Sequence, residues 1–192
     1  MATKEAIISL PNPRLHDKSR KVNLVSNDIH QIIEDMKSAA LDWEDHRPHE
    51  VGVALAAIQI ERPYKIIIVR NNFDDRRDRT FSVLINPEIT KLEGEIEDDY
   101  EGCLSVPDIY GVVPRHSKIR LKALNERGQP VKLRAEGFLA RVLQHEIDHL
   151  KGLMFTDLIK HKPRAFFKLT SGGKLKALNY EKDVKKSRLL WQ

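Results

Sequence analysis

The motif His145-Glu146-Ile147-Asp148-His149 constrains the fold more strongly than any other feature of the chain. Its two histidines are four residues apart, and residues at this spacing lie on one face of an α-helix. Two imidazoles placed in this way can bind one metal ion, and the glutamate next to the first of them can accept a proton from a metal-bound water. The motif therefore predicts a helix that carries part of a catalytic metal site.

The same five residues have a simpler interpretation. HExxH arises by chance in about a few chains per hundred of this composition, and a salt-bridged surface helix can carry it without a metal. A catalytic metal needs three protein ligands and an open position, so a third ligand must come from elsewhere. Cys103, in the segment EGCLS at 101–105, is one candidate, and Asp98 and Asp99 are others. A lone cysteine is more often buried packing, so spacing alone leaves the third ligand open.

The hydrophobic pattern around the motif predicts an α+β fold. Apolar residues recur at helical spacing over 28–43, and the motif helix is expected to run from 137 to 150 with a stop at Gly152. Runs rich in β-branched or alternating apolar residues are expected to be strands at 65–70, 81–86, 89–95, 118–124 and 131–135. Pro87 is expected to end the second strand. We expect mixed or antiparallel β-sheets packed around a central helix that carries HExxH.

A third segment, GVALAAIQ at 52–59, combines small residues with one amide. Small side chains permit close approach to a ligand, and the amide of Gln59 can stabilise an oxyanion. A buried helix start with Gln59 at its edge explains the same residues without any function. Taken alone, this segment favours the second interpretation.

Taken together, the three segments resemble the peptide deformylases. That family carries the boxes G-x-G-x-A-A-x-Q, E-G-C-L-S and Q-H-E-x-D-H in this order, and the chain has GVALAAIQ at 52–59, EGCLS at 101–105 and QHEIDH at 144–149. The resemblance covers about residues 5–160 and departs at Ala54, where the family has a second glycine. It implies removal of the formyl group from the N-terminal formyl-methionine of new polypeptides, with release of formate.

The resemblance also implies residue roles and a cofactor. The metal ligands are expected to be Cys103, His145 and His149, the catalytic acid/base Glu146, and the oxyanion donors Gln59 and the backbone N–H of Leu55. One divalent ion per chain is expected, Fe²⁺ in cells, with Zn²⁺, Ni²⁺ or Co²⁺ able to replace it in preparations. Coordination chemistry alone favours Zn²⁺ for two imidazoles and a thiolate.

The expected substrate is the N-formylmethionyl end of a nascent peptide, held in an apolar pocket. We expect its walls to comprise Gly52, Val53, Ala54, Leu104, Tyr110, Phe138, Arg141 and Val142. Ala54 is expected to alter peptide binding rather than the chemistry. Glu101 and Arg115 are expected to form an ion pair that positions the cysteine segment, and Asp148 to fix a histidine or cap a neighbouring chain.

Composition bears on compartment and partners. With 192 residues, 41% of them hydrophobic, the chain fits one globular domain. No apolar run is long enough for a membrane span and no signal-peptide core begins the chain, so we expect the cytoplasm, with an organelle after processing as the alternative.

Charge divides the chain into two parts. Ten lysines and arginines but two acidic residues follow position 159, so the net charge of +5 comes from the C-terminal tail. We expect a single catalytic deformylase domain at 1–165 and a basic tail at 166–192 that is partly helical or flexible. The tail is either a solvated segment or a surface for a polyanion, which in some family members is the ribosome.

Two other functions remain open on these residues. A zinc endopeptidase also uses HExxH, and it would take a third ligand other than Cys103. A ribosome- or RNA-binding protein built on an old enzyme scaffold would keep the boxes without metal or turnover.

Overall fold

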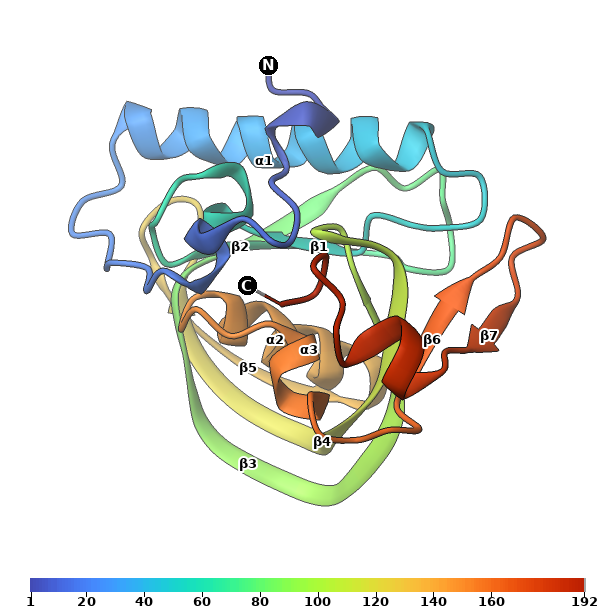
Figure 1. Cartoon of the computed structure of the whole chain (residues 1–192). Helices are drawn as coiled ribbons and strands as arrows, with labels where there is room; N and C mark the ends of the chain where they lie inside the picture. The colour runs from blue at the N-terminus through green and yellow to red at the C-terminus, as the bar shows by residue number, and fades with distance from the viewer. Residues whose placement is uncertain (192) are drawn as a thin grey trace.

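The computed structural model describes residues 1–191, in which one curled antiparallel sheet surrounds a central helix (Figure 1). The helices are α1 (Asn27–Asp45), α2 (Gly137–His149) and α3 (Phe155–Ile159). The strands are β1 (Ala54–Ala56), β2 (Ile66–Arg70), β3 (Phe81–Cys103), β4 (Val106–Leu124), β5 (Pro130–Glu136), β6 (Phe166–Leu169) and β7 (Leu175–Ala177). The sheet order is β1-β2-β3-β4-β6-β7, and β5 pairs with another stretch of β4. The predicted α+β class with antiparallel sheet around the HExxH helix is confirmed.

Strands β3 and β4 are long because register shifts interrupt their ladder without ending it. The expected stop at Pro87 is wrong: the two strands expected at 81–86 and 89–95 are one strand that continues to Cys103. Pro87 lies within a register shift, and Asn86 takes up the irregularity with a φ of 53°. A bulge of this kind tolerates the missing proline N–H and bends the strand.

Helix α2 lies inside the curled sheet, which explains why it is buried on nearly all sides. Its residues 140–149 are all buried, and Leu143 and Ile147 belong to a cluster with apolar residues of β1, β2, β4 and β5. Gln144 fixes the helix to β4, because its Nε2 donates to the carbonyl of His116 at 2.8 Å while its Oε1 accepts from the His116 N–H at 3.2 Å. The helix that carries the motif is therefore fixed in the sheet by apolar packing and by the two hydrogen bonds of Gln144.

Helix α1 covers the opposite face of β1 and β2 (Figure 1). The expected helix at 28–43 is confirmed with slightly wider bounds. Its apolar stripe packs on the sheet through Ile29, Ile32, Ile33, Met36, Ala39, Ala40 and Trp43. The C-terminal end of α1 leads into the loop at 46–53, which reaches the site described below.

Beyond residue 165, where we expected a partly helical or flexible tail, the chain forms the short hairpin of β6 and β7 and then one π-helical turn, Tyr180–Val184. β6 pairs with β4 at Ile109 to Gly111. Phe166, Val184 and Leu190 are buried in a cluster with residues of α3 and β4. Gln192, the last residue of the predicted tail, lies outside the described residues. No helix within 1–191 is both long and apolar enough to cross a membrane.

Candidate active site

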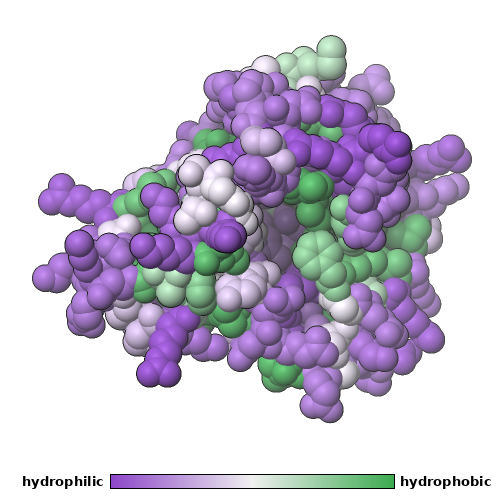
Figure 2. Space-filling model, turned by 90° about the vertical axis from the view of Figure 1, so that its right-hand side faces the viewer, coloured by the Kyte–Doolittle hydropathy of each residue, from purple (hydrophilic) through white to green (hydrophobic). Residues whose placement is uncertain are grey.

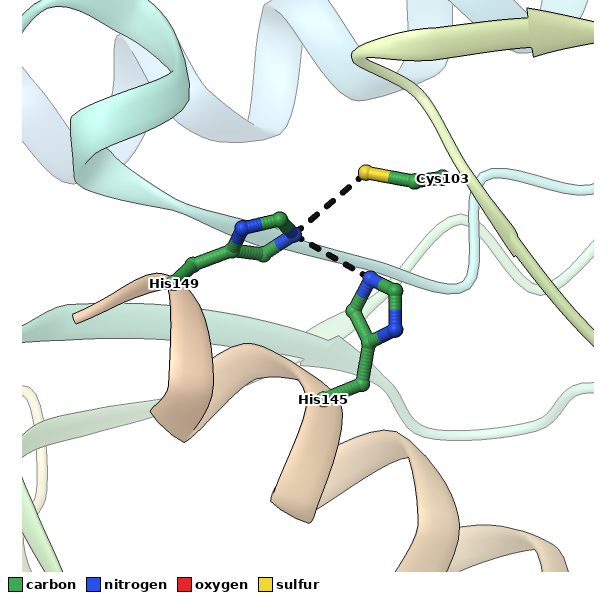
Figure 3. A group of neighbouring side chains, drawn as sticks. All are labelled: Cys103, His145 and His149. Atoms are coloured by element: carbon green, nitrogen blue, oxygen red, sulfur yellow. Dashed lines mark hydrogen bonds between the residues drawn. The ribbon is translucent and has the colours of Figure 1, made fainter. Parts of the chain in front are cut away.

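Three side chains with metal-binding atoms converge between β3 and α2. Cys103 ends β3, and His145 and His149 project from successive turns of α2 (Figure 3). The Sγ of Cys103 lies 3.3 Å from the Nε2 of His149, and the two histidine Nε2 atoms are 3.1 Å apart. Ligand atoms around one tetrahedral ion with bonds near 2.0–2.3 Å are separated by roughly 3.3–3.7 Å. All three donor atoms lie within 4.8 Å of one another, so they fit one metal ion.

Glu101 orients His145 through the ring nitrogen that does not face the triad. Its Oε2 lies 2.9 Å from the Nδ1 of His145, which leaves Nε2 of the ring to face the triad. Arg115 donates to Glu101 at 2.8 and 3.1 Å and also pairs with Asp148. The predicted Glu101–Arg115 ion pair is thus confirmed, and Asp148 holds the arginine rather than a histidine. Burial disfavours the charged carboxylate, but the hydrogen bonds with His145 and Arg115 outweigh it and lower the pKa of Glu101 to about 2.

Glu146 faces a cavity next to the triad and has an unsatisfied oxygen. The side chain is buried, and its Oε2 has no hydrogen-bond partner among the described residues. Burial raises the pKa of Glu146 to about 7. A carboxylate with such a pKa can both accept and return a proton near neutral pH, which suits a general acid/base.

Gln59 brings an amide donor to the same place. It lies in the short 3₁₀ turn Ala57–Ile60, where its Oε1 accepts from the backbone N–H of Ala56 at 2.8 Å. This bond turns Nε2 toward Ser105 Oγ at 3.0 Å and Cys103 Sγ at 3.5 Å. The expected helix start at 52–59 is instead strand β1 followed by this turn, because β1 pairs with the edge of β2.

A cavity of ≈ 280 Å³ opens beside the triad. Seven of the eight expected pocket residues line it: Val53, Ala54, Leu104, Tyr110, Phe138, Arg141 and Val142. Figure 2 shows a hollow on this face of the molecule, with hydrophobic residues at its border. Sequence reasoning missed six other wall residues, which are Trp43, His49, Glu50, Val51, Tyr100 and Gly102.

Besides the metal ligand His149, two predicted residues lie outside the cavity wall. Leu55 is buried in β1 opposite Ile68 and does not line the cavity, and the role of its N–H as an oxyanion donor stays a prediction. Gly52 packs instead against α1, where an added Cβ would lie 2.8 Å from the carbonyl oxygen of Ala40. Its N–H donates to the buried Glu44 at 2.9 Å. Gly52 therefore allows the loop to pass close to the helix.

The loop at 46–53 is held by buried charge that no motif indicated. Glu44, at the end of α1, pairs with the buried Arg70 of β2 at 2.8 Å and with Arg76 at 3.2 Å. Arg76 also donates to the carbonyl of Pro48 at 2.9 Å. These contacts join segments that are distant in the sequence, so no local sequence pattern could predict them.

Three of the wall residues have further contacts that fix their positions. Arg141 donates to the carbonyls of Val113 and Glu97, each at 2.6 Å, so its guanidinium clamps β3 and β4 while its stem faces the cavity. Tyr110 donates to Glu50 at 2.9 Å, and burial together with that carboxylate raises the pKa of the phenol. Phe138, half of which is exposed at the mouth, meets the ring of Phe73 edge-on with centroids 5.2 Å apart.

Comparison with known proteins places these residues in a family context. Residues 4–165 match the model of the family described as polypeptide deformylase. The peptide deformylase of Chromohalobacter salexigens is 39% identical over 156 residues, which span 81% of this chain and 86% of that protein. The peptide deformylase of Campylobacter jejuni is 36% identical over 179 residues, 92% of this chain and 97% of that protein.

Solved structures agree with the sequence comparison. A crystal structure of a peptide deformylase from Legionella pneumophila superposes with a TM-score of 0.72 at 34% identity, covering 82% of this chain and 86% of that one. A peptide deformylase from Synechococcus elongatus in complex with actinonin gives a TM-score of 0.71 at 30% identity, covering 81% and 79%. Both similarities extend over most of each chain.

Proposed function

The chain belongs to the polypeptide deformylase family, and we propose that it hydrolyses the formyl group from the N-terminal formyl-methionine of newly made polypeptides, with release of formate. The observation that supports this most strongly is the position of Cys103. Its sulfur lies beside both histidines of HExxH and beside the amide of Gln59. The thiolate separates this donor set from the two histidines and a carboxylate of thermolysin-like proteases.

The donor set supports one divalent ion per chain, held by Cys103, His145 and His149. When bound, such an ion supplies a Lewis acid and a water of lowered pKa. We propose Fe²⁺ as the ion in cells, with Zn²⁺, Ni²⁺ or Co²⁺ able to replace it. Glu101 positions the ligand His145 through the Nδ1 bond described above.

Glu146 is the proposed acid/base. The side chain lines the cavity and has a buried oxygen without a partner, and its pKa of about 7 lets it take a proton from the attacking water and return it to the leaving amine. The Nε2 of Gln59 is a proposed donor to the oxyanion that develops on the formyl oxygen, together with the N–H of Leu55. The Ala56–Gln59 bond fixes the orientation of this amide before substrate binds.

The cavity beside the triad is the proposed methionine pocket. Val53, Leu104, Phe138 and Val142 offer apolar walls, and the stem of Arg141 adds to them. Methionine is unbranched and polarizable, so it fills an irregular apolar cavity well. We also propose that Ala54 and Tyr110 contact the peptide that carries the methionine.

The basic tail is a proposed contact to the ribosome. Residues 166–191 carry seven exposed lysines and arginines against two acidic residues, and the ribosome is a polyanion, so attraction between them is expected from charge. Co-sedimentation with ribosomes should fall as salt rises and should be lost on removal of the charges. Because the curated relatives are bacterial proteins, we propose the cytoplasm as the compartment, with an organelle as the alternative.

Release of formate tests the function directly. Protein purified without oxygen and loaded with Fe²⁺ should release formate from a formyl-Met peptide and should leave an acetyl-Met peptide and internal peptide bonds intact. Glu146→Ala should lower the rate by roughly 10²–10⁴-fold, the range for a general acid/base. Undiminished turnover in this variant would refute the assignment of Glu146.

The endopeptidase alternative predicts a different effect of replacing Cys103. If the third ligand were another residue, Cys103→Ser would keep metal and activity. The deformylase assignment predicts loss of most bound metal in this variant, measured as metal per chain after dialysis. Cleavage of internal bonds by the wild type would favour the alternative.

A further inference from the structure

The hairpin of β6 and β7 stands at the mouth of the cavity, although it lies beyond the residues that match the family model. Four of the residues that line the cavity are exposed and therefore mark its mouth: His49, Tyr100, Gly102 and Phe138. The hairpin contacts two of them. The ring of Phe167 meets Tyr100 edge-on with centroids 5.0 Å apart, and an added Cβ on Gly173 would lie 3.6 Å from the ring of His49.

The hairpin turns its apolar face to this side. Phe167 lies directly opposite Tyr110 of β4 and Ala177 of β7, and directly opposed residues of antiparallel strands share one face. Leu169 and Leu175 form the next pair on the same face. Tyr110 lines the cavity, so this face of the sheet continues outward from the cavity wall. Phe167, Leu169 and Leu175 are each half-buried and keep surface for a further contact.

The opposite face of the hairpin differs in charge. Lys168 and Lys176 are directly opposed and exposed there, on the side that begins with the buried Phe166. No salt bridge is formed by either lysine within residues 1–191. The hairpin thus presents apolar side chains toward the mouth and positive charge away from it. Figure 1 shows its tip beside the loop that follows α1.

We propose that the β6–β7 hairpin is an outer wall of the peptide groove and that it favours apolar side chains at the third and fourth residues of the formylated peptide. The inference rests on the proposed function, because it needs the methionine to occupy the cavity. The chain that follows the methionine must leave through the mouth. On that path it meets the face that carries Phe167, Leu169 and Leu175, where an apolar side chain loses water-exposed surface.

A peptide series on the wild-type protein tests the preference without any substitution. The Fe²⁺-loaded enzyme is given formyl-Met-Ala-X-X amides in which both X residues are Leu, Ser, Asp or Lys, with formyl-Met-Ala amide as the reference. The Leu peptide should exceed the Ser peptide in kcat/KM by about tenfold, as expected for apolar side chains in an apolar site. Equal values, or a preference for Asp, would overturn the inference.

A pair of double variants locates the preference on the hairpin. Leu169→Ser with Leu175→Ser should bring the Leu/Ser ratio of kcat/KM toward one, whereas Lys168→Ser with Lys176→Ser should leave it near its wild-type value. The ratio is measured within one preparation, so it does not depend on the fraction of folded enzyme. An unchanged ratio in the leucine variant would overturn the inference.

Two further outcomes distinguish this proposal from dimerisation through the apolar face and from failure of the proposed function. If a second copy of the chain covers the apolar face, sedimentation should show a dimer that the leucine variant dissociates, and the Leu/Ser ratio should be one in all proteins; this contradicts the proposal. If no peptide yields formate, including formyl-Met-Ala amide, the proposed function itself fails. Formate from the reference peptide with no preference among the longer ones refutes the hairpin alone.

Discussion

Glu101→Gln should weaken both the fold and the metal site, because one carboxylate holds three cationic or ring groups together. It accepts from Arg115 at 2.8 and 3.1 Å, from Arg141 at 3.0 Å and binds Nδ1 of His145 at 2.9 Å. The side chain is 5% exposed, so water cannot replace a lost partner easily. Glutamine keeps the size but turns an NH₂ donor toward groups that are themselves donors.

The magnitude follows from the burial of these charges. Removal of one partner from a buried ion pair costs about 3–5 kcal/mol, and Arg115 keeps Asp148, which places the expectation toward the lower end. For a chain of this size each kcal/mol shifts Tm by about 2–4 °C, so a cost of about 3 kcal/mol lowers Tm by roughly 6–12 °C. Loss of the group that orients a metal-bound histidine typically lowers metal affinity by about 10–100-fold.

Two assays separate the effects, and one variant serves as the control. Thermal unfolding of the metal-free protein reports the fold, and titration with Zn²⁺ against a chelator of known affinity reports the site. Glu93→Gln is the matched control, because Glu93 also forms a paired contact with an arginine, Arg120 at 2.6 and 3.0 Å, but on the surface far less protected from solvent. Glu101→Gln with the Tm and metal affinity of Glu93→Gln would refute the reasoning.

Three further predictions concern the titration of Glu101, the support of the loop at 46–53 by Glu44, and Ala54 in the cavity wall. Folding lowers the pKa of Glu101 from its ordinary value of 4.5 to about 2, so its contribution to stability is present above pH 4.5 and is lost as pH falls toward 2. Over that window the unfolding free energy of wild type should decline more steeply than that of Glu101→Gln, and parallel curves would contradict this. Glu44→Gln should raise KM for formyl-Met peptides more than it lowers kcat, because it loosens Gly52 and the loop at 46–53 but leaves the triad in place; a fall in kcat alone would count against that role. Ala54→Gly should raise kcat/KM on a formyl-Met peptide by relieving the Cβ on the cavity wall, and equal efficiency of the two proteins would show that Ala54 is neutral.

The sequence predicted the parts of the site that local spacing and motif order encode. The HExxH helix, its burial and the approach of Cys103 to both histidines follow from three ordered motifs. The helix α1 and the runs that became β2 and β5 were visible because their hydrophobic periods are regular. These features depend on neighbours within one element, which a single sequence displays.

The missed parts depend on contacts between distant segments. Residues 96–100 of β3, beyond the strand expected at 89–95, are exposed and mostly acidic, so no alternation marked them as strand. Their ladder with β4 holds them extended. Trp43 reaches the cavity from the end of α1, and His49 from the loop at 46–53, which Glu44, Arg70 and Arg76 hold in place. β6 and β7 are only a few residues long, too short for a period to show.

The most direct test of the central claim is a metal titration followed by formate release. Metal-free protein is titrated with Fe²⁺ under anaerobic conditions, and both bound metal and the rate on a formyl-Met peptide are recorded for wild type and Glu146→Ala. The rate of wild type should rise in proportion to bound metal and level off at one ion per chain, while Glu146→Ala should bind one ion and remain nearly inactive. Full activity without bound metal, or in the Glu146→Ala protein, would contradict the assignment of the triad and its acid/base.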